Sequence, residues 1–369
     1  KGLRFSGQVW AIPEGRLYFC EEPVIEVTAS IIEAQLVETF IINQVNLQSL
    51  IATKAARTVW AAREKTVVDF GLRRAHGIDA GMKVARASYI AGCQGTSTVL
   101  AGREYGIPLV GTMAHSFVTS FEHELDSFRA FARSFPQNTI LLIDTYDTLE
   151  GARKAAVVAK EMEVEGNRMK GVRLDSGEMA QLSKEVRRIL DSEGLGYVRI
   201  VASGGLDEYE VDSLLRQGAP IDSFGVGTKM GVSGDAPWLD MAYKLVKYEG
   251  RPVLKLSTGK ASLPDEKQVL RYRGNDNSLL GDVIGLRSES SDGAGGEPIL
   301  CKVMEEGSIL GALPSLPEIQ ERFREEFTQL EARYKALREP VHYPVELSPG
   351  LRTLRDQIQH AVEREELRG

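Results

Sequence analysis

The sequence contains little cysteine and no excess of positive charge. Its three cysteines, Cys20, Cys93 and Cys301, are far apart and form no CxxC or Cys/His cluster. A disulfide framework or structural zinc site is therefore not indicated, and reduced thiols in a cytoplasmic protein fit this pattern. The 45 Lys and Arg residues stand against 52 Asp and Glu residues, for a net charge of −7. We therefore expect no nucleic-acid partner and no membrane-surface binding, so an anionic ligand must be held by a local site.

A long uninterrupted hydrophobic run is also missing. The longest apolar region, residues 31–60, is broken by several acidic and amide side chains, so we expect no membrane span there, and we expect no signal peptide. With 369 residues and 43% hydrophobic content, the chain can form a large core and more than one domain. It starts at Lys1 in a strand-and-turn segment, and we expect the first domain to have a further upstream part.

Alternating strands and helices are predicted over most of the chain. Short strands with a Pro-Glu-Gly hairpin turn are expected over residues 1–28, and Ser30 to Glu33 has the form of a capping box that opens a helix to Arg63. The predicted strands that follow lie in TVVDFGL, IPLVGT, TILLID, MKGVRLD, YVRIVASG and SFGVGT. The predicted helices lie at 79–91, 96–104, 120–133, 149–163, 178–192 and 207–216. This order predicts βαβ units around a buried parallel sheet.

The fold class follows from this alternation and from where it ends. Without a clear dinucleotide fingerprint, the βαβ units favour an α/β barrel over an open doubly wound sheet. From about residue 245, antiparallel strands are predicted instead, followed by a charged helix over residues 317–338. We predict an irregular α/β barrel (31–244) plus a smaller α+β domain, which residues 1–30 and 245–369 build together.

Polar side chains and glycines follow the predicted strands at their carboxyl ends, where α/β barrels carry their chemistry. In strand order they are Arg73, Arg74 and His76; Thr112 and His115; Asp144, Thr145 and Asp147; Arg173, Asp175 and Ser176; Ser203, Gly204 and Gly205; and Gly225, Gly227 and Thr228. Each has a plain structural explanation, such as an aspartate that caps a helix or a glycine that forms a tight turn. Their recurrence at the same strand ends favours a functional site.

The last two strand ends are the most informative. The turns ASGG and GVGT are rich in glycine and lead into helices, so their backbone N–H groups can approach an anion closely. We expect them to hold one phosphomonoester. Arg173 and Asp175 stand two residues apart, so both side chains can point to the same mouth. Arginine holds carboxylates or pyrophosphate and aspartate binds ribose hydroxyls or Mg²⁺, which indicates a phosphorylated sugar as ligand.

Taken together, these segments resemble the nicotinate phosphoribosyltransferase family, of the type II phosphoribosyltransferase group. The resemblance covers nearly the whole chain and is carried by IEAQLVETFIIN, LIATKAAR, DFGLRRAHGIDAG, GTSTVLAGREYGIPLVGTMAHSFVTSF, LLIDTYDT, VRLDSGE, ASGGLDE, FGVGT and VHYPVELSPGLRTLRD. It implies transfer of phosphoribose from phosphoribosyl pyrophosphate to nicotinate, the first step of NAD salvage from nicotinate. It also implies Mg²⁺, ATP as co-substrate coupled through a phosphohistidine (a ligase-type classification), and a homodimer that shares its active sites.

The resemblance also implies roles for individual residues. His115 of GTMAHS falls on the phosphorylated histidine, and a neutral imidazole there can attack the γ-phosphate of ATP. Asp175 is expected to act in catalysis at the ribose or as a metal ligand. The expected nicotinate contacts are Thr112, Arg173, Arg73 and Arg74. The expected phosphoribosyl pyrophosphate contacts are Thr228, Ser203, Gly204, Gly205, Gly225, Gly227, Lys54 and Arg57. The family also carries an N-terminal tyrosine that packs on nicotinate, which we expect upstream of Lys1.

Three other functions remain as alternatives. A nicotinamide phosphoribosyltransferase would bind an amide, whereas adjacent Arg73 and Arg74, with Arg173, favour a carboxylate. A Schiff-base aldolase needs a lysine at the mouth, but Lys170 lies at the start of its predicted strand. A non-catalytic phosphosugar-binding barrel would keep the glycine turns and have no use for His115.

Overall fold

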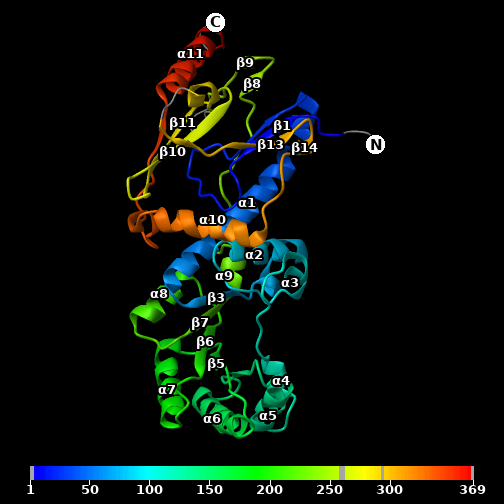
Figure 1. Cartoon of the computed structure of the whole chain (residues 1–369), viewed down its shortest axis with the longest axis vertical. Helices are drawn as coiled ribbons and strands as arrows, with labels where there is room; N and C mark the ends of the chain where they lie inside the picture. Colours follow the sequence, from blue (N-terminus) through cyan, green and yellow to red (C-terminus); the bar gives the residue numbers. More distant parts are fainter. Residues whose placement is uncertain (1–3, 257–261, 292–294, 367–369) are drawn as a thin grey trace. The chain divides into compact units, whose positions relative to one another are not determined.

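The chain divides into two units, each with its own sheets (Figure 1). The structure is a computed structural model that describes residues 4–256, 262–291 and 295–366. Unit 1 consists of Lys1–Asn46 with Asp240–Gly369, and unit 2 is Leu47–Leu239. The first division falls within helix α1 (Ile31–Ala62), whereas the sequence placed a boundary at its start. A mixed α/β unit with a parallel sheet and a separate smaller unit, as predicted, is confirmed.

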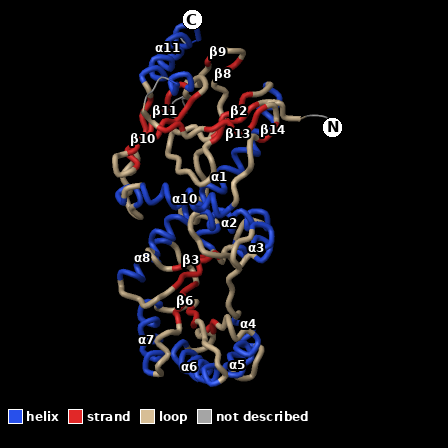
Figure 2. The backbone as a smooth tube through the Cα atoms, viewed as in Figure 1, coloured by secondary structure: helices blue, strands red, loops and turns tan. Residues whose placement is uncertain are grey.

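Unit 2 is built on a five-stranded parallel sheet, shown as the lower group of strands in Figure 2. Its order is β3 (Thr66–Asp69), β7 (Ser223–Val226), β6 (Arg199–Ser203), β5 (Gly171–Leu174) and β4 (Ile140–Leu142). The strands are mostly buried, as the apolar runs predicted. Single parallel bridges join Asp69 to Thr96 and Thr96 to Leu109, so the predicted IPLVGT strand contributes only a bridge residue. No pairing joins Leu109 to β4 within the described residues, and the ladder is therefore an open arc rather than a closed ring.

The helices of unit 2 follow the strands as crossovers. They are α2 (Ile78–Ile90), α3 (Val99–Tyr105), α4 (His115–Thr119), α5 (Glu124–Ser134), α6 (Thr148–Val164), α7 (Met179–Ser192), α8 (Glu208–Arg216) and α9 (Thr228–Gly231). Asp147 and Asp207 precede α6 and α8 directly, and each carboxylate accepts hydrogen bonds from two backbone N–H groups of the first turn. These two aspartates therefore have the structural role of helix caps. The predicted helix 120–133 begins only at Glu124, since a separate short helix, α4, precedes it.

Unit 1 combines segments from both ends of the sequence. One sheet has the order β14 (Ser308–Ile309), β13 (Cys301–Glu305), β1 (Gln8–Ala11) and β2 (Ile25–Thr28). The other has the order β12 (Glu297–Pro298), β10 (Lys267–Arg273), β11 (Leu279–Leu286) and β15 (Val345–Leu347). Strands β8 (Lys247–Tyr248) and β9 (Arg251–Pro252) form a hairpin. Because β1 pairs with β13, the C-terminal segment returns to the N-terminal one, as predicted.

Some local predictions for unit 1 were wrong. Residues 13–15 form a turn, with the Arg16 N–H donating to the Pro13 carbonyl, but β1 pairs with the more distant β2. The helix expected at 317–338 is α10 (Leu316–Gln329), followed by a short 3₁₀ helix, Ala332–Lys335. Helix α11 (Pro349–Glu366) was not predicted. No helix in the described part of the chain is long and apolar enough to cross a membrane.

Candidate active site

Arg173 is the centre of a hydrogen-bonded cluster at the carboxyl end of the parallel sheet. Its Nε donates to Ser203 Oγ at 2.7 Å, its Nη1 to Thr112 Oγ1 at 2.8 Å and its Nη2 to Asp175 Oδ1 at 2.7 Å. The guanidinium also lies 5.4 Å from the centre of the Phe70 ring. Arg173 therefore joins residues that follow four of the predicted strands, and of its partners Thr112, Asp175 and Ser203 were predicted site residues whereas Phe70 was not.

Asp175 is ionised at neutral pH. Its Oδ1 accepts from Ser203 Oγ at 2.5 Å as well as from Arg173. Burial raises the pKa of Asp175, but the hydrogen bond from Ser203, together with the charge and hydrogen bond of Arg173 and the proximity of His115, outweighs it, so the pKa lies below its usual value. The other oxygen, Oδ2, lies 3.7 Å from His115 Nε2.

His115 is the first residue of α4, and its side chain is 44% exposed. The ring Nδ1 lies 3.1 Å from Thr145 Oγ1, while Nε2 faces Asp175. Two neighbouring strand ends thus orient the imidazole, and the ring remains accessible to a co-substrate. The backbone is extended at Ala114, and α4 begins with His115.

The two glycine turns, residues 203–205 and 225–228, are kept free of side chains by close backbone contacts. Gly204 has φ +92°, and a Cβ atom there would lie 1.9 Å from the carbonyl oxygen of Asp175. At Gly227 a Cβ atom would lie 2.8 Å from the carbonyl oxygen of Phe70. Gly205 has φ +69° and open space around it, and Thr228 is exposed at the start of α9. These turns present backbone rather than side chains, as anion sites require.

Two residues that the sequence placed at a strand end, without assigning a role, belong to the cluster. Asp144 Oδ2 accepts from the Asp175 N–H at 3.0 Å and from Ser176 Oγ at 2.6 Å. Its Oδ1 is buried and has no hydrogen-bond partner among the described residues. Thr145 contacts His115 as above. A third residue, Phe70, was missed because an aromatic side chain after a strand carries no signal that distinguishes it from a core residue.

Four of the predicted site cations lie outside this cluster. Arg73 and Arg74 are exposed on a 3₁₀ helix, Leu72–Arg74, with no side-chain partner in the described ranges. Lys54 and Arg57 are paired instead with the carboxylate of Glu208, which is fully buried. The structure thus gives Lys54 and Arg57 protein partners where the sequence predicted substrate contacts.

The carboxylates of the cluster fit a magnesium ion that arrives with substrate. No group of three His, Cys, Asp or Glu side chains able to hold a metal occurs in the part of the chain that the structure describes. Mg²⁺ commonly uses one or two carboxylates and completes its shell with water and substrate phosphates. Asp144 Oδ1, which has no partner among the described residues, and Asp175 Oδ2, which lies 3.7 Å from His115 Nε2, are the oxygens that would serve in that arrangement.

An ionised aspartate, an oriented histidine and side-chain-free turns at the carboxyl end of a parallel sheet are typical of α/β enzymes that bind phosphorylated substrates. Comparison with known proteins narrows this class. Residues 66–268 match the nicotinate phosphoribosyltransferase (NAPRTase) family and residues 294–355 match the nicotinate phosphoribosyltransferase C-terminal domain. The chain belongs to the nicotinate phosphoribosyltransferase family, which confirms the resemblance expected from its motifs.

Individual relatives agree with this family. A nicotinate phosphoribosyltransferase of Mycobacterium tuberculosis is 48% identical over 364 residues, covering 98% of this chain and 77% of the relative. The enzyme of that name from Bacillus subtilis is 36% identical, covering 96% and 77%. The crystal structure of human nicotinic acid phosphoribosyltransferase superposes with a TM-score of 0.83 at 30% identity, covering 96% of this chain and 83% of the human chain. A nicotinate-nucleotide pyrophosphorylase from Pyrococcus furiosus gives 0.76 at 30% identity, covering 88% and 81%.

Proposed function

We propose that this protein transfers the phosphoribosyl group of phosphoribosyl pyrophosphate to nicotinate, with ATP hydrolysis coupled through a phosphohistidine at His115. The products are nicotinate mononucleotide and pyrophosphate, in the first step of NAD salvage from nicotinate. Family membership supports the reaction class. The single observation that carries the proposal is the cluster in which Arg173 binds both Thr112 and Asp175, because it combines a carboxylate-binding group with a ribose-binding group.

Nicotinate would bind through its carboxylate and its ring. Arg173 and Thr112 present a guanidinium and a hydroxyl side by side, and a guanidinium matches a carboxylate in geometry. The Phe70 ring, next to Arg173, offers a flat apolar face on which a pyridine ring can stack. The exposed Arg73 and Arg74 remain candidates for the same carboxylate. This arrangement favours nicotinate over nicotinamide, since a carboxylate accepts stronger, charge-assisted hydrogen bonds from a guanidinium than a neutral amide does.

Phosphoribosyl pyrophosphate would bind at the glycine turns. Backbone N–H groups of residues 203–205 and 225–228 would hold the 5′-phosphate, and the ionised Asp175 would accept from a ribose hydroxyl. Asp144 and Asp175 would hold Mg²⁺, which when bound would supply positive charge toward the leaving pyrophosphate. The ring nitrogen of nicotinate forms the new bond to the anomeric carbon as the bond to pyrophosphate breaks. No general base is needed, because that nitrogen already carries a lone pair.

His115 would couple ATP to this transfer. A ring nitrogen of the accessible imidazole takes the γ-phosphate of ATP, ADP leaves, and water later hydrolyses the phosphohistidine. Thr145 and Asp175 contact opposite nitrogens of the ring and hold it in place for this step. We also propose that the protein acts as a homodimer with shared active sites, as the family resemblance implies.

A product assay tests the proposal. Purified protein is incubated with phosphoribosyl pyrophosphate, Mg²⁺ and either nicotinate or nicotinamide, with and without ATP, and the mononucleotides are separated by chromatography. Nicotinate mononucleotide should form and increase with ATP. The variant His115→Ala should lose the ATP stimulation and its ³²P label from γ-labelled ATP, whereas His123→Ala, an exposed histidine before α5, should keep both. Exclusive use of nicotinamide would replace the proposal with the amide-specific enzyme, and no conversion of either base would favour a non-catalytic phosphosugar-binding barrel.

A further inference from the structure

A buried ion-pair cluster connects the two segments that carry the glycine turns. Lys54, on α1, is 5% exposed, and its Nζ donates to Glu208 at 2.9 Å and contacts Asp235. Glu208 begins α8, directly after the first turn, and Asp235 lies beyond α9, after the second turn. One ammonium group therefore bridges the two loops that follow β6 and β7.

The ion pairs of this cluster are stable, because a buried carboxylate depends on them. The carboxylate of Glu208 is fully buried, and such a charge must be paired to be tolerated. Arg57 provides a second partner, with Nε donating to Glu208 at 2.9 Å and Nη2 donating to the Tyr209 hydroxyl at 3.1 Å. Burial alone would lower the pKa of Arg57, but pairing with Glu208 raises it above its usual value. Both cations are therefore held by protein groups and have little freedom to bind a phosphate.

A second ion pair joins the same two loops. Lys229, in α9, donates from Nζ to Asp207 Oδ2 at 2.8 Å, while Oδ1 of that aspartate caps α8. Burial raises the pKa of Asp207, but the hydrogen bond from Lys229 and the capped N–H groups lower it below its usual value. The loops that bear the glycine turns are thus connected at two places by charged hydrogen bonds.

We propose that Lys54 is a positioning residue of the phosphoribosyl site, because it fixes the separation of the two glycine turns through Glu208 and Asp235 without touching the substrate. The inference rests on the proposed function, in which N–H groups from both turns hold one 5′-phosphate. A constellation of donors must be held to within about 0.5 Å to bind such a group well. The β6–β7 ladder holds the two turns together where they begin, at Ser203 and Gly225. Beyond that pair the glycines have no side chains, so the restraint on the rest of each loop has to come from neighbouring residues. Releasing one loop should weaken phosphosugar binding and leave the nicotinate contacts of Arg173 in place.

The test changes Asp235, the partner of Lys54 on the second loop. Asp235 has a side chain that is 48% exposed, so Asp235→Asn should fold normally while it removes the anchor on the second loop. The matched control is Asp191→Asn, which removes an aspartate of 56% exposure from an ion pair with Arg187 at the far end of α7. We expect Asp235→Asn to raise the KM for phosphoribosyl pyrophosphate by about tenfold or more, with the KM for nicotinate and the melting temperature unchanged. Asp235→Glu, which keeps the carboxylate, should recover most of the wild-type KM.

A binding measurement separates this inference from the proposed function. Ribose 5-phosphate is titrated into wild-type protein, Asp235→Asn and Asp191→Asn by calorimetry, without any turnover. If the wild type forms no mononucleotide but binds ribose 5-phosphate more tightly than Asp235→Asn does, the proposed reaction fails and the positioning role stands. Equal affinity in all three proteins, or no binding by the wild type, overturns the positioning role. An active wild type whose KM for phosphoribosyl pyrophosphate is unchanged in Asp235→Asn also overturns it.

Discussion

Arg173 donates a hydrogen bond to Asp175 at 2.7 Å, although only one residue separates them along the chain. Strand β5 ends between the two, and residues two apart in extended chain point to the same side, so the pair faces the site together. The same guanidinium fixes Thr112 and Ser203 through its other nitrogens. Arg173 therefore presents a carboxylate-binding group and, together with Ser203, lowers the pKa of Asp175.

Removing the arginine is expected to shift the acid limb of the activity profile. In Arg173→Met, burial still raises the pKa of Asp175, but the opposing charge and hydrogen bond are gone, so the pKa should rise. Because the carboxylate is the active form, activity should be lost at a higher pH as the solution is acidified. The measurement is kcat/KM for phosphoribosyl pyrophosphate between pH 4 and 8, at saturating nicotinate. Arg129→Met, which breaks a surface pair with Glu161, should leave the profile unchanged.

The hydroxyl of Thr145 is expected to matter only for ATP coupling. Thr145→Val keeps the shape of the side chain but removes the group 3.1 Å from His115 Nδ1, so the imidazole loses one of its two orienting contacts. We expect the ATP-stimulated rate to fall by about tenfold or more, with the ATP-independent rate little changed. Steady-state rates with and without ATP measure this split. An equal loss in both rates would show that Thr145 supports the fold rather than the histidine, and Thr119→Val serves as a control hydroxyl on α4.

The two adjacent glycines of the first turn should respond differently to alanine. In Gly204→Ala the new Cβ would lie 1.9 Å from the Asp175 carbonyl oxygen, and φ is +92°, so the turn must move away from β5. Gly205→Ala meets open space and carries only the strain of φ +69°, about 1 kcal/mol of unfolding free energy. We expect Gly204→Ala to lose ribose 5-phosphate binding and substantially more stability, measured by urea unfolding. Comparable behaviour of both variants would contradict the steric argument.

The sequence predicted the parallel sheet and the strand ends because buried parallel strands have strong apolar runs and follow one another at regular intervals. It therefore brought Thr112, His115, Arg173 and Asp175 to one edge correctly. It could not resolve IPLVGT, where only single bridges form, since a bridge and a short strand share the same apolar pattern. The pairing of Lys54 and Arg57 with Glu208 could not be predicted for a different reason. Which anion a cation meets depends on tertiary contacts with Glu208, far away in sequence.

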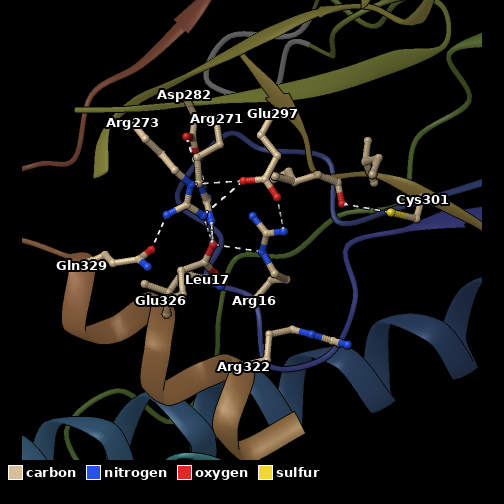
Figure 3. A network of polar contacts seen from close by, with 12 residues as sticks. Arg16, Leu17, Arg271, Arg273, Asp282, Glu297, Cys301, Arg322, Glu326 and Gln329 are labelled. Atoms are coloured by element: carbon tan, nitrogen blue, oxygen red, sulfur yellow. Dashed lines mark hydrogen bonds and ion pairs between the residues drawn. The ribbon is translucent and has the colours of Figure 1, made fainter. Parts of the chain in front are cut away.

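The network of ion pairs in unit 1 likewise could not be predicted from the sequence. Arg271 on β10 is fully buried and donates to Asp282 on β11 and Glu326 on α10, and Arg16 and Arg273 also reach Glu326 (Figure 3). Glu297 pairs with both Arg16 and Arg273. The buried Glu22 adds a fourth carboxyl group next to Asp282. Three guanidinium groups thus stand among four carboxyl groups, so the network contains one more acid than base.

The raised pKa of Glu22 keeps this carboxyl protonated at neutral pH and predicts a pH-dependent stability. Burial, and then the hydrogen bond and charge of Asp282, raise the pKa of Glu22 to about 9. In the unfolded chain Glu22 has its ordinary pKa of 4.5 and loses its proton above that pH, whereas the folded protein keeps the proton up to about pH 9. The stability of the fold should therefore fall as the pH rises from about 4.5 to 9. Glu22→Gln keeps an N–H donor toward Asp282 and removes the titration. We expect its melting temperature to match that of the wild type near pH 5 and to exceed it increasingly toward pH 8.5. The difference in unfolding free energy should grow by at most about 1.4 kcal/mol per pH unit. The control is Glu21→Gln, at the exposed neighbouring position, whose melting temperature should follow that of the wild type at every pH. If the difference in melting temperature between Glu22→Gln and the wild type is the same at every pH, Glu22 is ionised in the folded protein.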